Sequence, residues 1–209
     1  MKQKVINKLN DFGLNEISEL CVNFQDDGTV HDILYNANIT VFQSSSIGHK
    51  ERLSFLKELN KICKNNKEHF CLAHNLTLMI KVSKELGLNK NLTKDSHKAI
   101  ELWKKVLDRP LAINGLIFSY VDLGLIFSDY NLNSLALKYL DKADSLLTEC
   151  ENEYFPYVKL HVAYAVIHNR MKNYKKAYNF YNLVGKKAEL KNDDMTLIPI
   201  LNNIGDNFL

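Results

Sequence analysis

Apolar residues along the carboxy-terminal half of the chain recur three and four positions apart, which is the spacing of one face of an α-helix. Short polar or turn-forming stretches separate these blocks. Pro156 opens one of them, and proline suits a first helical turn because its missing N–H is not needed there. The pattern predicts helices over about residues 111–129, 133–147, 156–171, 173–191 and 193–205.

The amino-terminal half shows the same spacing with less regular breaks. Gly87 is expected to end a helix, because glycine readily adopts the left-handed conformation found at many helix ends. Asp95 or Ser96 is expected to cap the following helix, which Pro110 terminates. The other elements predicted here are two short helices up to residue 24 broken at 11–13, helices over about 29–43, 49–64 and 68–86, and a loop over 44–48.

Small residues recur at a nearly constant interval in the carboxy-terminal half. Gly124, Ala165 and Gly205 are evenly spaced (165 − 124 = 41 and 205 − 165 = 40), and Ala136 and Ala177 have the same separation (177 − 136 = 41). We call this separation the repeat interval. A fixed period of this size is typical of stacked helical hairpins, each of which buries its apolar face against its neighbours. We therefore predict an all-α fold of stacked hairpins with a repeat of about 40 residues.

One stretch resembles a tetratricopeptide repeat. Small residues occupy the positions where the two helices of such a repeat touch, and large apolar residues lie between them: Gly124, Ala136 and Ala143 with Tyr120, Leu123, Phe127 and Leu140. The next unit departs from the pattern, since Ala165 replaces the glycine and Val184 replaces the later small residue. The repeat is also longer than the roughly 34 residues typical of the family. The resemblance implies a right-handed α–α superhelix.

The resemblance covers residues 111–190 well, 68–110 weakly and 1–67 not at all. We expect residues 1–67 to form a divergent helical region that packs onto or caps a solenoid of residues 68–209. Its units are expected over about 68–110, 111–150, 154–191 and an incomplete 193–209. The long repeat is similar to those of bacterial sensory proteins, which implies a regulatory region at the front of a longer protein.

Composition narrows the function. The net charge is only +3, and three of the 27 basic residues are arginines, which argues against direct nucleic-acid binding because arginine supplies the bidentate contacts. The most apolar run, residues 76–82, is far shorter than the roughly 20 residues that span a bilayer, so no membrane partner is expected. We interpret the four dispersed cysteines as reduced core thiols of a cytoplasmic protein: Cys21, Cys63, Cys71 and Cys150.

No catalytic residue, metal site or cofactor is predicted. Cys63, Cys71 and His74 suggest a metal site or a Cys–His enzyme, but no paired short spacing supplies a further ligand and no orienting group is evident. His161 and His168 lie seven apart (168 − 161) and would suit a pH switch or a metal pair. They fall where the repeat places side chains that fill the contact between helices, so core packing is expected.

The concave face is the predicted binding surface. The first helix of each hairpin is expected to line this face, so first-helix residues outside the packing stripe would meet a ligand. Asparagine carboxamides can both donate to and accept from a peptide backbone, and arginine can engage a carboxylate bidentately. The candidate ligand-binding residues are Val121, Leu125, Asp129, Val162, Val166, Asn169, Arg170, Asn202, Asn203 and Asp206.

The favoured hypothesis is a non-catalytic module that binds a peptide or protein segment and regulates a bacterial cytoplasmic signalling protein. A homodimerisation scaffold without a small ligand is the alternative, and a Cys/His-dependent enzyme is the remote one. Lysines also gather on the second hairpin, where a solvated helix face is the expected explanation and an acidic partner the other: Lys172, Lys175, Lys176, Lys186, Lys187 and Lys191.

Overall fold

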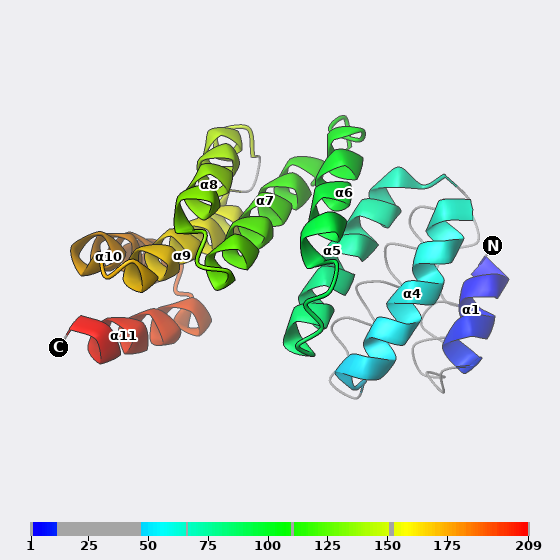
Figure 1. Ribbon diagram of the computed structural model, residues 1–209, viewed down its shortest axis with the longest axis horizontal. Coiled ribbons are helices and arrows are strands. Elements are labelled where there is room, and N and C mark those ends of the chain that lie inside the picture. Colours follow the sequence, from blue (N-terminus) through cyan, green and yellow to red (C-terminus); the bar gives the residue numbers. More distant parts are fainter. Residues whose placement is uncertain (1, 12–46, 66, 110, 151–152, 209) are drawn as a thin grey trace. The chain divides into compact units, whose positions relative to one another are not determined.

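The computed structural model describes residues 2–11, 47–65, 67–109, 111–150 and 153–208, and within these ranges every regular element is an α-helix (Figure 1). The predicted all-α class is therefore confirmed. The predicted elements between residues 12 and 46 lie outside the described residues, as does Cys21. The helices are α1 (Lys2–Asp11), α4 (His49–Asn65), α5 (His69–Glu85), α6 (Leu92–Lys104), α7 (Ala112–Asp129), α8 (Asn133–Leu147), α9 (Tyr154–Arg170), α10 (Tyr174–Leu190) and α11 (Asp194–Phe208).

The chain divides into two compact units, Met1–Gly115 and Leu116–Leu209, and the division falls within α7. In the first unit α4 packs on α5, and α5 packs on α6. Residue 67, where the sequence suggested a domain boundary, lies inside this unit between α4 and α5.

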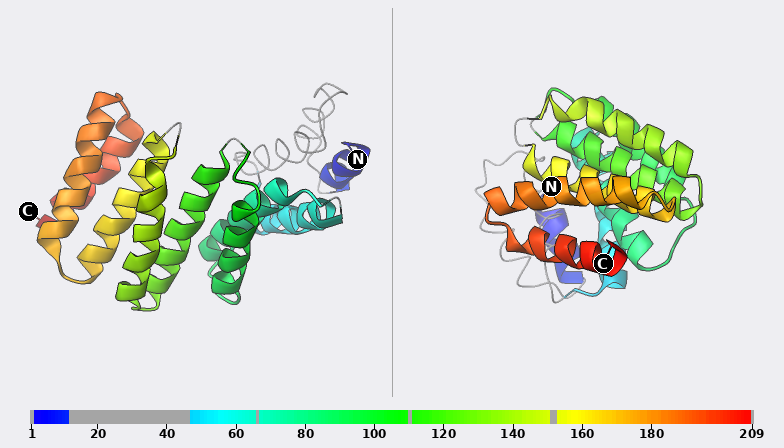
Figure 2. Two further views of the ribbon diagram at one scale, coloured as in Figure 1. Left: turned by 90° about the horizontal axis from the view of Figure 1, so that it is seen from above. Right: turned by 90° about the vertical axis from the view of Figure 1, so that its left-hand side faces the viewer.

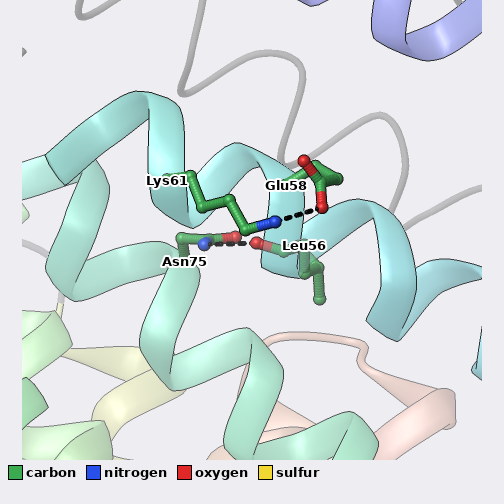
Figure 3. Close-up of polar contacts among 4 residues, drawn as sticks. All are labelled: Leu56, Glu58, Lys61 and Asn75. Carbon is green, nitrogen blue, oxygen red and sulfur yellow. Dashed lines mark hydrogen bonds and ion pairs between the residues drawn. The ribbon is translucent and has the colours of Figure 1, made fainter. Parts of the chain in front are cut away.

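Two buried side chains hold the first unit together. Asn75 on α5 is fully buried and its Nδ2 donates to the carbonyl oxygen of Leu56 on α4 at 2.8 Å (Figure 3). Trp103 on α6 lies edge-on to Phe70, with ring centroids 5.0 Å apart, and its Nε1 donates to Thr77 Oγ1 at 3.2 Å. Both contacts give a buried N–H donor a partner, which avoids the cost of burying that donor unpaired, while Asn75 Oδ1 is buried without a hydrogen-bond partner among the described residues.

The first unit also shows where local sequence signals hold and fail. Gly87 has φ +70°, and the N–H of Leu88 donates to Ser83 O at 2.8 Å, so the predicted helix end is confirmed. The predicted cap of α6 is wrong, because α6 begins earlier, at Leu92. Ser96 lies within the helix, where its hydroxyl donates to Leu92 O at 2.8 Å instead of capping.

The second unit contains two antiparallel helix pairs followed by α11. At Gly124 on α7, an added Cβ would lie 3.1 Å from Ala136 O and 3.0 Å from Leu140 Cδ2, so these two helices approach closely because glycine has no side chain. The turns joining α7 to α8 and α9 to α10 lie at the same end of the helices (Figure 2, left). Ile200 of α11 completes a core cluster with Ala165 of α9 and Tyr181 of α10.

Several contacts of the first helix pair recur in the second pair, one repeat interval further along the chain. Asn131 and Lys172 (172 − 131 = 41) have φ values of 61° and 60° in the two turns. Phe127 stacks on Tyr139 with centroids 5.4 Å apart, and at the equivalent positions His168 stacks on Phe180 at 5.7 Å. The two helix pairs thus have similar turn conformations and similar ring contacts.

Candidate functional site

The surface shared by α7 and α9 carries most of the predicted binding residues. Asp122 Oδ1 of α7 lies 2.8 Å from Lys159 Nζ of α9, and further along Asp129 Oδ1 lies 2.8 Å from Arg170 Nη1. Half-buried apolar side chains lie on the same helices between these ion pairs: Leu125, Val162 and Val166. The arrangement is an apolar centre with an ion pair at each end, which we call the α7–α9 surface.

Val121 does not belong to this surface. Its side chain is fully buried, so the prediction that it meets a ligand is wrong. Val162, at the matching position one repeat interval later, is half-buried and packs against the core cluster that includes Ile200 of α11. The helical spacing did not distinguish a position facing solvent from one covered by packing, because both lie beside the same apolar stripe.

Arg170 already has partners within the protein. Its Nη1 pairs with Asp129 and donates to Ser128 Oγ at 3.0 Å, while Ser128 Oγ donates to Asn133 Oδ1 at 2.8 Å. Arg170 therefore joins α9 to the end of α7 and the start of α8, and a ligand carboxylate would have to compete with Asp129. Sequence reasoning missed this pair, although Asp129 and Arg170 are separated by the repeat interval (170 − 129 = 41).

The predicted asparagines differ in environment. Asn169 on α9 is half-buried and Asn202 on α11 is exposed. Asn203 uses its Nδ2 to donate to Pro199 O at 2.9 Å, one turn earlier in α11. Asp206 lies in α11, but its side chain is outside the part that the structure describes.

A column of rings runs along α9 against α10, as the repeat predicted for its two histidines. His161 stacks on Tyr157 with centroids 3.9 Å apart, and His168 is buried against Phe180. Desolvation by burial lowers the pKa of both imidazoles, and nearby Lys176 lowers the pKa of His168 further. Nδ1 of His168 is buried without a hydrogen-bond partner among the described residues, which fits a neutral packing residue.

The cysteines of the first unit are core residues. Cys63 and Cys71 are fully buried, and burial raises the pKa of the Cys63 thiol to about 12, so it stays protonated near neutral pH. His74 is half-buried, edge-on to Trp103 at 6.5 Å. Among the described residues no three His, Cys, Asp or Glu side chains come together as a metal site.

Cys150 does not fit the expectation of a core thiol. It follows the end of α8 and is only half-buried. Partial burial raises its pKa, as do the carboxylates of Glu149 and Glu153.

Within the described ranges, one helix is long and apolar enough to cross a membrane by length and composition, namely α7. Of that segment 56% is buried inside the structure, as expected for a core helix of a folded protein, which meets the same criteria.

Comparison with known proteins adds no identification: no family model matches the chain, and no curated protein matches it. Inference about function therefore rests on the geometry given above.

Proposed function

We propose that the second unit is a right-handed superhelix of tetratricopeptide-like hairpins, without catalytic activity, that binds a peptide or protein segment on its concave face. The recurrence of turn conformation and ring stacking at the repeat interval supports the hairpin repeat. A role as the regulatory region of a bacterial cytoplasmic signalling protein rests on the sequence resemblance alone.

The α7–α9 surface is the observation that carries the proposal. Leu125 and Val166 offer apolar contact area that is already partly desolvated, which suits the side chains of a bound peptide. Asn169, next to Arg170, carries a carboxamide, a group that can both donate to and accept from a peptide backbone. The ion pairs at both ends orient charges and disfavour segments with mismatched charge.

Selection from a random peptide library displayed on phage, followed by fluorescence anisotropy with the selected peptides, tests this function. Val166→Asp places a charge in the apolar centre and is expected to weaken binding by about tenfold or more. Leu183→Asp, on an exposed position of α10, is the matched control and should leave affinity unchanged. Asn169→Ala with Asn202→Ala should also weaken binding while retaining the far-UV circular dichroism of the parent.

The proposal is wrong if Val166→Asp and Leu183→Asp bind the selected peptides as tightly as the parent. If Val166→Asp and Leu183→Asp weaken binding equally, the peptide does not bind specifically at the α7–α9 surface.

A second candidate, self-association without a small ligand, is favoured by the exposed side of α11. Ile198 and Leu201 are 58% and 54% exposed, and a Cβ added at Gly205 would meet nothing within 4 Å, unlike one at Gly124. A second copy could cover this apolar side. Sedimentation equilibrium should then show a dimer that Leu201→Glu dissociates, and a concentration-independent monomer mass excludes this candidate.

A further inference from the structure

The two turns at one end of the second unit expose large apolar side chains. Large apolar side chains that are exposed to solvent bury little area in the core. Where several of them lie together, they indicate a surface for a partner. We call this set the turn edge; its members are Tyr130 (48% exposed), Leu132 (50%), Leu135 (36%), Met171 (42%) and Tyr174 (49%).

Arg170 joins the two turns, and a backbone hydrogen bond closes each of them. Arg170, next to Met171, reaches Asp129 and Ser128 beside Tyr130, at 2.8 and 3.0 Å. Each turn closes with the same backbone hydrogen bond, from Leu132 N to Phe127 O at 2.9 Å and, at the equivalent positions of the next pair, from Asn173 N to His168 O at 2.8 Å. Both turns lie at the same end of the helix pairs (Figure 2, left). Arg170 thus links the two turns that carry the exposed side chains.

Lysine predominates around the turn edge, where the neighbouring carboxylate of Asp129 is paired with Arg170. Residues 130–140 and 171–182 contain no Asp or Glu. They contain four lysines, all exposed, and none of these four forms an ion pair with another described residue: Lys138, Lys172, Lys175 and Lys176. The other end of α10 is different, because Lys187 pairs with Glu153 at 2.7 Å and Glu189 lies close to Lys186 and Lys191 in sequence.

We propose that the turn edge is a second interaction surface, which binds an acidic protein segment carrying apolar side chains. The unpaired lysines would steer and orient carboxylates, and the apolar members would cover the partner's apolar residues. Three of the five apolar members are the aliphatic residues Leu132, Leu135 and Met171, which favour a protein over single-stranded nucleic acid, whose bases stack on aromatic rings. Arg170, the arginine beside the edge, is already paired with Asp129.

The test uses short fluorescent peptides in which Glu content and Leu/Phe content are varied independently. The peptides rich in both are expected to bind the full chain, and replacing Glu by Gln or Leu/Phe by Ser should each weaken binding about tenfold. Lys175→Glu with Lys176→Glu should weaken binding by a similar factor. Lys186→Glu with Lys191→Glu makes the same charge change on the other end of α10 and should have little effect.

Apolar contact has its own matched pair. Leu132→Ser should weaken binding, whereas Leu190→Ser, at an 83% exposed position, should not. Val166→Asp, which tests the α7–α9 surface, should leave binding of these peptides unchanged, so the two proposals can fail separately. Circular dichroism of every variant confirms that it is folded.

Three results would overturn the turn-edge proposal. One is no binding of any acidic, apolar peptide at about 1 mM. Another is equal weakening by the two lysine pairs, which would indicate general charge attraction. The third is tighter binding to phosphatidylserine vesicles or to oligo(dT) than to every peptide, which would assign the edge to a membrane or a nucleic acid.

Discussion

Replacing Gly115 by alanine would place a methyl group where the indole of Trp103 lies. A Cβ built at Gly115 falls 2.5 Å from Cε2 and Cζ2 of this ring and 2.7 Å from Cη2. Carbon atoms in contact normally lie about 3.5–4 Å apart, so the ring or the helix must move by about 1 Å. Trp103 is 2% exposed, so there is no solvent space for this shift.

The magnitude follows from what holds the ring in place. Moving Trp103 strains its hydrogen bond to Thr77, which contributes about 1 kcal/mol, and its edge-on contact with Phe70, which contributes about 0.5–1.5 kcal/mol. Overpacking of a filled core typically costs about 1–3 kcal/mol. Alanine regains about 1 kcal/mol of helix propensity over glycine within α7. The overpacking and the two weakened contacts together outweigh this gain, and we expect Gly115→Ala to destabilise the first unit by about 2 kcal/mol.

Urea unfolding measures this effect, because Trp103 is the only tryptophan in the chain and its fluorescence reports on the first unit. The midpoint should fall by about 1 M. Gly185→Ala is the matched control, since its Cβ would meet Ile200 at an ordinary 3.7 Å, and it should stabilise the second unit as followed by circular dichroism. In a Trp103→Phe background Gly115→Ala should cost less. An unchanged or higher midpoint for Gly115→Ala would refute the packing argument.

Other substitutions and pH changes test further contacts. The pKa of His168 is lower in the folded state than in the unfolded chain. The free energy of unfolding should therefore fall as the pH drops below about 6.5, because the unfolded chain then binds a proton that the folded protein does not. His168→Phe should reduce this fall in urea titrations at several pH values. Asp193→Ala removes the acceptor for the Thr196 N–H at 3.1 Å, and amide exchange at the start of α11 should become faster. Cys63 should resist thiol reagents in the native protein and react after unfolding, as mass spectrometry of labelled peptides would show. Asn75→Ala removes the buried hydrogen bond from Nδ2 to Leu56 O that joins α5 to α4 and leaves a space in the core, and it should cost about 1–3 kcal/mol in urea unfolding.

The sequence predicted the helices of both units closely where local signals act alone. The start of α11 is an example, because Asp193 accepts the Thr196 N–H as a helix-capping aspartate should. The prediction failed for α6, where two candidate capping residues, Asp95 and Ser96, lie inside the helix that begins at Leu92. Capping preference is a weak local signal, and packing of the helix decides which turn is its first.

The candidate site was predicted less well. Leu125 and Val166 are half-buried, whereas Val121 is fully buried. The pairing of Asp129 with Arg170 was not foreseen either. The burial of Val121 and the ion pair both depend on how α9 packs against α7. The spacing of residues within one helix does not predict that packing.

The amino-acid sequence alone determined that the described part of the chain is helical and where most of its helices begin and end. Helix formation and helix ends depend on residues within one or two turns of each other, so the spacing of residues along the chain reveals them. The tertiary structure alone decided that Trp103 fills the space beside Gly115, that Arg170 pairs with Asp129, and that the turns joining α7 to α8 and α9 to α10 lie at the same end of their helices. Those contacts join residues far apart in the chain, so they exist only once the helices have packed.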